Sequence, residues 1–436
     1  MTKMRIKMLS LALLAGGFFG YAQTQRKMSL SEAVSLSIKH NSKLKITEAK
    51  LNTLNSKVRE AKGNRLPNLK LSGSIMKPFN SMELKSDLPL FKMGNSASAV
   101  PQYIAVQQIN MEVPIFSGFK IKSGIEIAEY QKLLQQYQLE NDKQDVALAV
   151  TQVFIDLYKA KQAINVINEN LSRAHQRSVD FEKLERNGVV ARNDLMRVKL
   201  QESNVKLSLA DAKKNVNVLN YNLSILLGEE EINIDPDMRI DEASSLVNEE
   251  SLQEKALQQR QEYHMLAEQD KIGKANIDIA QSAYYPTVAF TAGYMNAWIS
   301  DLLQVNHMTT MGLSLSYDLA SLYKNKAATE TARLQYIETQ EYRKELDENI
   351  KTDIHNAYQD YLLQNEKIKV YKESVDQANE NYKVVKNKFD NGLATTTDLL
   401  TADVEQLQAH INLVYGKADE KWAYFNLLRK AGEIKY

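Results

Sequence analysis

Apolar residues recur at heptad spacing over a long stretch of the chain. They are separated alternately by four and three residues, at Val146, Val150, Val153, Leu157, Ala160, Ile164, Ile167, Leu171 and Ala174. Such spacing is typical of helices that pack along one stripe in a coiled coil. Between Gly118 and Asn187 the sequence has no Pro and only one further Gly. The pattern therefore predicts one helix about 100 Å long, at ~1.5 Å per residue.

The same pattern returns 204 residues later in the sequence. The matching positions are Ile350, Ile354, Ala357, Tyr361, Gln364, Ile368, Tyr371, Val375 and Ala378, of which only Gln364 is neither apolar nor aromatic. Near the start of each half the offset is 219, because Pro67 matches Pro286. Two unrelated amphipathic helices would share the spacing but not the register of their turn residues. We therefore infer two tandem structural repeats.

Each repeat is expected to run helix, strand, loop, strand, long helix, turn, helix. The first repeat spans 23–228 and the second 251–436, with first helices at 29–62 and 252–282. The connector at 229–250 holds nine carboxylates and one Arg, with little helical periodicity. The whole chain has only 7 Pro and 16 Gly, which favours a mainly helical fold.

Period-two alternation predicts four strands per chain. The clearest cases are 107–116, with Ile109, Met111, Val113 and Ile115, and 312–319, with Leu313, Leu315, Tyr317 and Leu319. Two stretches near 69–75 and 288–294 alternate more weakly. A sheet of this kind could bury its apolar face in a soluble core. It could equally turn that face to lipid, opposite a polar lumen.

The N-terminus predicts export from the cytoplasm. Three cations at Lys3, Arg5 and Lys7 precede a short apolar run that ends at Phe19, and small residues follow. We interpret 1–22 as a signal peptide, because the run is shorter than the roughly 20 residues that a spanning helix needs. The exported chain has no Cys, which excludes disulfides.

Charge and motifs narrow the classes of function. Without the signal peptide, 52 Lys and Arg face 54 Asp and Glu, and this balance does not indicate a nucleic-acid partner. We find no catalytic constellation, no local pair of His for a metal and no nucleotide-binding loop, so no catalytic, cofactor or metal residue is assigned. We therefore expect a protein that is not an enzyme and that depends on a partner for energy.

Four strands impose a condition on any membrane location. The smallest closed barrels have about eight strands. An open sheet edge in lipid leaves backbone N–H and C=O groups unsatisfied, at a cost of several kcal/mol each. Either the strands lie outside the membrane, or several chains share one barrel.

Three motifs resemble the TolC-like outer membrane efflux proteins. Asn-Gly-x5-Asp-Leu occurs at 187–195 and 391–399, and Val-Pro-Ile-Phe-Ser-Gly at 113–118. The resemblance covers essentially the whole exported chain. It implies a mixed α/β membrane protein, mainly α, that forms a homotrimer. A 12-stranded β-barrel would lie in the outer-membrane lipid and a long α-helical tunnel in the periplasm, with the connector in an equatorial region.

The resemblance also implies the partners. The protein would be the passive exit duct of an efflux or secretion system, coupled to a periplasmic adaptor and an energised inner-membrane transporter. The alternative is a soluble periplasmic coiled-coil adaptor or scaffold without a barrel. An adaptor of that kind would be expected to carry one helical hairpin rather than four strands in tandem repeats.

The turns after the long helices hold the candidate site residues. The pairs Asn187-Gly188 and Asn391-Gly392 are expected to form the periplasmic tips that contact the adaptor, with φ > 0 at each glycine. By the resemblance, Asp398 is the candidate periplasmic gate residue, where a threefold axis would gather three carboxylates. The alternative is an ordinary Asp near a helix N-terminus.

Two further residues complete the predictions at the tips. Asp194 corresponds to Asp398 in the first repeat and is expected only to start a helix after its tip. Some relatives carry a second acid three residues beyond the gate, whereas Thr401 occupies that position here.

Overall fold

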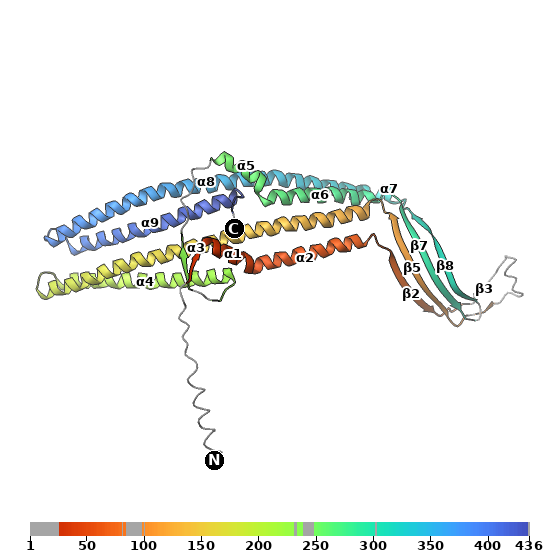
Figure 1. Ribbon diagram of the computed structural model, residues 1–436, viewed down its shortest axis with the longest axis horizontal. Coiled ribbons are helices and arrows are strands. Elements are labelled where there is room, and N and C mark those ends of the chain that lie inside the picture. Colours follow the sequence, from red (N-terminus) through yellow and green to blue (C-terminus); the bar gives the residue numbers. More distant parts are fainter. Residues whose placement is uncertain are drawn as a thin grey trace, which may run out of the picture. The chain divides into compact units, whose positions relative to one another are not determined.

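The computed structural model describes residues 26–80, 82–83, 98–99, 101–230, 233–238, 248–300 and 303–434. The predicted signal peptide and part of the connector lie outside these residues. The chain divides into two compact units (Figure 1). Unit 1 comprises Met1–Ile46, Glu140–Arg260 and Asn349–Tyr436, and unit 2 comprises Thr47–Leu139 and Gln261–Glu348.

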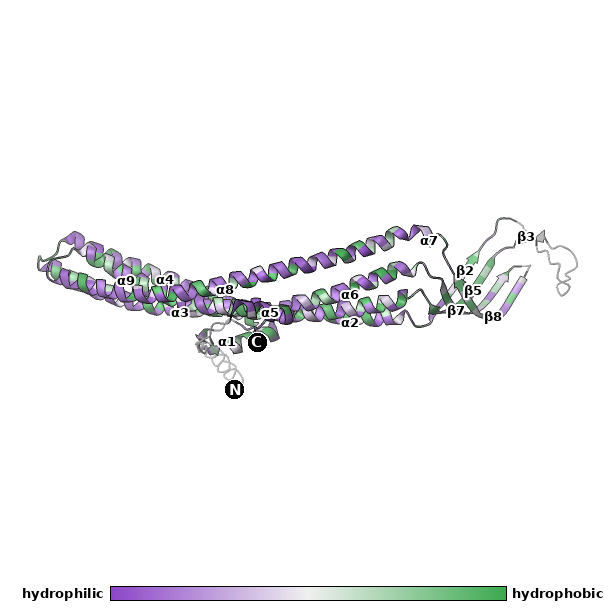
Figure 2. Ribbon diagram, turned by 90° about the horizontal axis from the view of Figure 1, so that it is seen from above, coloured by the Kyte–Doolittle hydropathy of each residue, from purple (hydrophilic) through white to green (hydrophobic). Residues whose placement is uncertain are grey.

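Unit 1 is built on two helical hairpins. Helix α3 (Lys120–Arg186) is followed by α4 (Arg192–Leu227), and α8 (Lys326–Asp390) by α9 (Thr396–Lys430). The first parts of α3, up to Leu139, and of α8, up to Glu348, belong to unit 2. In each hairpin the second helix runs back beside the first (Figure 1). Hydrophobic residues form stripes along helices whose remaining surface is mostly hydrophilic (Figure 2).

The heptad positions form the core of these hairpins. Val150, Leu157 and Ile354 are fully buried, and Ile167 packs with Val205 across α3 and α4. Side chains at heptad spacing lie on one face of a helix, which is why the sequence pattern locates this core.

The first helix of each repeat is divided, contrary to the single helix predicted at 29–62. Helix α1 (Leu30–His40) ends at Asn41, whose backbone is extended, and α2 (Ser42–Gly63) follows at once. The Asn41 side chain accepts a hydrogen bond from the Lys43 N–H at 2.9 Å, so it caps the new helix. A local side-chain acceptor of this kind competes with continuation of the helix.

The second repeat has the same break. Helix α5 (Glu249–Gln259) ends at Arg260, whose ψ is 129°, and α6 (Gln261–Ser282) begins at the next residue. The single helix predicted at 252–282 was therefore also wrong. The bounds of α5 and α6 are those of α1 and α2 shifted by 219 residues.

Unit 2 contains a four-stranded antiparallel sheet. Its strands are β2 (Asn68–Met76), β5 (Ile104–Phe116), β7 (Thr287–Ile299) and β8 (Leu303–Ser316), in the order β2-β5-β7-β8. The alternating stretches found in the sequence therefore do contribute to the strands of one sheet, but the stretch predicted at 312–319 extends too far, because β8 ends at Ser316 and Tyr317 and Leu319 follow it. Strands β2 and β8 lie at its two edges.

Five short elements among the described residues were not predicted. In unit 1, β1 (Arg26–Ser29) pairs in parallel with β6 (Ile234–Asp237), so the connector contributes a strand. Met28 and Ile234 from these strands are buried. In unit 2, β3 (Met82–Glu83) pairs with β4 (Ser98–Ala99), and α7 (Ser321–Lys324) precedes α8. Strands of two to four residues are too short to show a period.

Candidate functional site

The turn after each long helix has the same hydrogen bonds. The N–H of Val189 donates to the carbonyl of Leu184 at 2.8 Å, and the N–H of Gly188 donates to that of Glu185 at 2.9 Å. This pair of bonds is a Schellman motif, which requires a left-handed residue after the helix. Gly188 has φ = 70° and Gly392 has φ = 71°, as the sequence predicts.

Asp398 forms a capping box at the start of α9. The Thr395 hydroxyl accepts from the Asp398 N–H at 3.2 Å, and the Asp398 carboxylate accepts from the Thr395 N–H at 2.8 Å. These hydrogen bonds from the Thr395 side chain and backbone lower the pKa of the exposed Asp398 carboxyl. The helix-start interpretation therefore explains the hydrogen bonds that Asp398 forms within one chain. Its role as a gate residue stays a prediction.

Asp194 has a different environment from Asp398. It lies in the first turn of α4, as predicted, but the N-cap residue there is Ala191, which offers no side-chain acceptor. Asp194 is half-buried and lines a cavity of about 710 Å³ between the two turns of unit 1. Gly392 and Thr395 also line this cavity, whereas Asp398, Gly188 and the two turn asparagines do not.

A buried ion pair near the two turns joins the α3–α4 hairpin to the α8–α9 hairpin. The sequence did not predict this ion pair. The Arg177 guanidinium on α3 lies 2.9 Å from the carboxylate of Asp403 on α9, which is 0% exposed. Asn170 donates to the same carboxylate at 3.3 Å, and Arg177 also donates to the Tyr382 hydroxyl at 3.3 Å. Burial alone would lower the pKa of Arg177, but the hydrogen bond and charge of Asp403 outweigh it and raise the pKa.

A signal for this cluster was present in the sequence. Asp403 follows Leu399 by four residues, which places it on the same face of the helix. Leu399 is buried, so a carboxylate on that face required a buried partner.

The sheet of unit 2 separates apolar from polar side chains. Leu69 on β2 faces Met111 on β5, which in turn faces Ala292 and then Met311 across the sheet. On this face the edge-strand side chains are exposed, with Leu69 at 70% and Met311 at 82%, and Met111 and Ala292 on the inner strands are half-buried. The opposite face is more polar and carries Lys70, Ser72, Asn110, Gln108, Thr310 and Ser314, together with the apolar Val106, Met295 and Met308. An exposed apolar face of this extent marks a surface that something apolar covers.

Within the described part of the chain, no group of three or more His, Asp or Glu side chains is placed to hold a metal ion. Helices long and apolar enough to cross a membrane are also absent from the residues that the structure describes.

The sequence matches a family model in two segments that together cover most of the chain. The model is that of the outer membrane efflux protein, and the matched residues are 33–229 and 252–433. The chain belongs to this family. Among curated protein sequences no significant match was found.

Solved structures of outer-membrane channels share the fold of this outer membrane efflux protein. The outer-membrane channel OprN has a TM-score of 0.77 and 15% identity, with 93% of this chain and 90% of that chain covered. VceC from Vibrio cholerae has a TM-score of 0.75 and 15% identity, covering 92% and 96%. CmeC from Campylobacter jejuni has a TM-score of 0.76 and 15% identity, with 93% of this chain and 85% of that chain covered. At these identities the likeness concerns the fold.

Proposed function

We propose that this outer membrane efflux protein is the passive exit duct of a tripartite efflux or secretion system. Three copies would share a 12-stranded barrel in the outer membrane and a helical tunnel in the periplasm. The observation that carries the proposal is the open sheet of unit 2, which has an exposed apolar face and two free edge strands. In lipid, the apolar face would contact acyl chains, and the two edges would require further strands beside β2 and β8.

The number of copies follows from strand arithmetic together with the family. Two chains would supply eight strands, which is about the minimum for a closed barrel. Three chains would supply twelve, and the resemblance to the TolC-like proteins favours three. The polar face, with Lys70, Ser72 and Asn110, would then line the lumen.

The mass of the native assembly tests this architecture. We expect purified protein in detergent to show three times the mass of one exported chain by native mass spectrometry. A mass of about 50 kDa, that of the full single chain at 49.6 kDa, would overturn the shared barrel.

The partners are inferred from what the chain lacks and what its turns offer. The sequence has no nucleotide-binding loop, so an inner-membrane transporter would supply the energy. The turns at Gly188 and Gly392 would contact a periplasmic adaptor, and the cavity between them offers that adaptor a recess lined from both repeats. Deleting a neighbouring adaptor gene should abolish export while leaving the trimer intact.

The alternative function is that of a soluble periplasmic adaptor or scaffold. It predicts recovery of the protein in osmotic-shock fluid, whereas the duct predicts recovery in the outer-membrane fraction. The exposed apolar face of the sheet favours the duct, because a soluble protein rarely exposes so large an apolar patch.

A further inference from the structure

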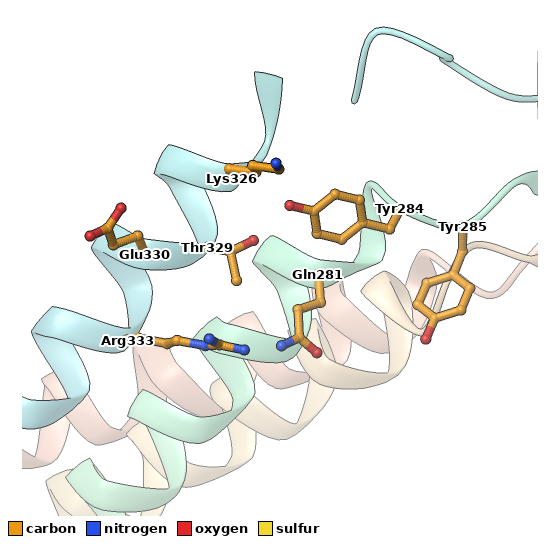
Figure 3. Close-up of a pocket in the computed structure, with 7 residues that line it drawn as sticks. All are labelled: Gln281, Tyr284, Tyr285, Lys326, Thr329, Glu330 and Arg333. Carbon is orange, nitrogen blue, oxygen red and sulfur yellow. The ribbon is translucent and has the colours of Figure 1, made fainter. Parts of the chain in front are cut away.

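A cavity of about 540 Å³ lies in unit 2, where the sheet gives way to the helices (Figure 3). It is lined by Gln281 at the end of α6, by Tyr284 and Tyr285 just after it, and by Lys326, Thr329, Glu330 and Arg333 at the start of α8. Tyr285 stands two residues before β7, so the cavity borders the strands directly. Its location is therefore the level at which the apolar sheet face ends.

Contacts join the segments that line the cavity. The Asn325 amide donates to the carbonyl of Ala280 at 2.6 Å, which joins the start of α8 to the end of α6. Further along, Gly273 lets Tyr336 approach so closely that an added Cβ would lie 2.9 Å from its ring. The Tyr317 hydroxyl also donates to the carbonyl of Tyr284 at 3.4 Å.

The side chains around the cavity are mainly hydrogen-bond donors. Lys326 and Arg333 form no ion pair with any residue that the structure describes, although both are cationic. The Lys326 side chain extends toward the hydroxyl of Tyr284, and the Arg333 guanidinium toward Gln281 (Figure 3). Glu330 is the one acidic residue of the lining, and its carboxylate points away from Tyr284 and Gln281 (Figure 3).

Thr329 supplies an independent indication of a ligand. It is only 8% exposed, and its hydroxyl has no hydrogen-bond partner within the described structure. A buried hydroxyl without a partner costs free energy, and such exceptions are uncommon in native proteins. An acceptor bound between Lys326 and Arg333 would satisfy it.

We propose that this cavity binds the phosphate of an anionic phospholipid headgroup, an inference that rests on the proposed membrane location of the sheet. An ammonium, a guanidinium and two hydroxyls match the oxygens of a phosphodiester, and Arg favours bidentate contact with phosphate. Two exposed aromatic side chains nearby, Tyr285 at 48% and Tyr323 at 68%, have the amphipathic character of residues at membrane–water interfaces.

The position of the cavity beside the apolar sheet face favours a phospholipid over free phosphate as the bound anion. Leu313 and Leu315 carry exposed side chains near the end of the apolar face, and they precede the cavity residue Lys326 closely in the sequence. The acyl chains of a bound lipid would lie against these two side chains. A free anion would gain nothing from that surface. Lys326 and Arg333 would bring anionic headgroups to the same level.

Lipid retention by the intact assembly tests the site. Full-length protein would be incubated with phosphatidylglycerol, phosphatidylcholine or diacylglycerol, and bound lipid counted by native mass spectrometry. We expect retention to fall in that order for the wild type. Lys326→Gln with Arg333→Gln should lower phosphatidylglycerol retention by about tenfold, the effect of losing roughly 1.4 kcal/mol of binding.

Matched variants separate this site from surface charge in general. Arg343→Gln with Lys351→Gln removes two exposed cations from the same helix, α8, and should leave retention unchanged. Thr329→Val keeps the shape of the side chain, removes the hydroxyl and should reduce retention of both phospholipids. The site would be overturned if the control variant lost as much lipid retention as the Lys326→Gln with Arg333→Gln variant. It would also be overturned if the latter variant lost none.

The same spectra distinguish the other occupants. Loss of lipid on adding inorganic phosphate, without any preference among lipids, would overturn the lipid source in favour of a free anion. Failure of the double variant to form trimers would indicate that a second copy fills the cavity. Wild-type trimers without lipid preference overturn this proposal alone, whereas wild-type monomers overturn the proposed duct.

Discussion

At the residue scale, two opposing effects act on the Asp398 carboxyl. Within one chain, hydrogen bonds from Thr395 lower its pKa. In a trimer with Asp398 on the axis, repulsion among three carboxylates would raise the pKa of the group. A measured pKa above the ordinary range would therefore indicate that the three carboxylates meet, and one below it that they do not.

We predict that block of the channel by divalent cations depends on pH through this group. Because a gate ring binds cations only when ionised, block should be lost as pH falls through the pKa of Asp398. If the ring forms, the midpoint should lie above the ordinary carboxyl range of about 4. A midpoint below that range, measured by conductance in planar bilayers, would show an isolated capping carboxylate.

Substitutions separate the charge of Asp398 from its capping role. Asp398→Asn should weaken cation block and raise leak conductance, because the negative charge is lost. Thr395→Ala removes the capping hydroxyl but keeps the carboxylate, so it should leave block in place. Asp194→Asn should change neither property. Block that survives in Asp398→Asn channels would assign the gate to other residues.

The buried pair of Arg177 and Asp403 predicts a large loss of stability. Asp403→Ala would leave a buried guanidinium without its counter-charge, at a cost of about 3–5 kcal/mol. We expect a clear drop in the thermal unfolding midpoint, measured in detergent. Asp180→Ala removes an exposed carboxylate on the same helix as Arg177 and should cost under about 1 kcal/mol.

A double variant tests whether this loss comes from the unpaired charge. Arg177→Leu with Asp403→Leu replaces both ionic side chains by apolar ones and should recover much of the stability lost in Asp403→Ala. If the double variant is no more stable than the single one, the pair contributes packing rather than charge compensation.

At the element scale, the two turns depend on left-handed glycines. A Cβ at Gly188 or Gly392 would meet no atom within 4 Å, so only the backbone conformation opposes substitution. Gly188→Val with Gly392→Val should therefore destabilise each turn by about 1–2 kcal/mol. We predict loss of export in complemented cells, with the trimer still detectable by native mass spectrometry.

The matched control for the turns uses a residue that tolerates φ > 0. Gly188→Asn with Gly392→Asn adds side chains of similar exposure but at a smaller conformational cost. Export by this variant should approach that of the wild type. Equal defects in the Val and Asn variants would mean that the side chains block docking, and unchanged export in the Val variant would refute the docking role.

Periodicity located the long elements and missed the short interruptions. Heptads placed Val150, Leu157 and Ile354 in the core because the stripe extends over many turns of helix. The break between α1 and α2 takes up only one residue, Asn41, which is too short to interrupt the hydrophobic spacing. Strand β6, four residues long, was missed because it is too short to show a period.

At the scale of the whole molecule, the free edges of the sheet determine how copies would associate. The strands of a shared barrel would bring β8 of one copy beside β2 of the next. Within one chain these strands are three spacings apart, about 14 Å. A disulfide needs Cα atoms closer than about 7 Å, so a bond between them can form only between copies.

Engineered cysteines can therefore detect the shared barrel against a background without native Cys. We predict that Ser72→Cys, paired in turn with Thr310→Cys, Ser314→Cys and Ser316→Cys, gives covalent dimers and trimers in at least one combination. Asn110→Cys with Ser314→Cys, which uses an inner strand, should give none. Absence of cross-links in every edge pair, read on non-reducing gels, would contradict closure through these strands.

The sequence by itself determined the long helices, the four alternating strands and the glycine turns. Each of these follows from local rules: side-chain period in helix and strand, and the freedom of Gly188 and Gly392 to adopt φ > 0. Only the tertiary structure decided that Asp403 meets Arg177 and that Asp398 forms a capping box. It also decided that Lys326 and Arg333 border a cavity with the unsatisfied hydroxyl of Thr329. These contacts join residues from separate helices or depend on local side-chain geometry, which hydrophobic spacing does not encode.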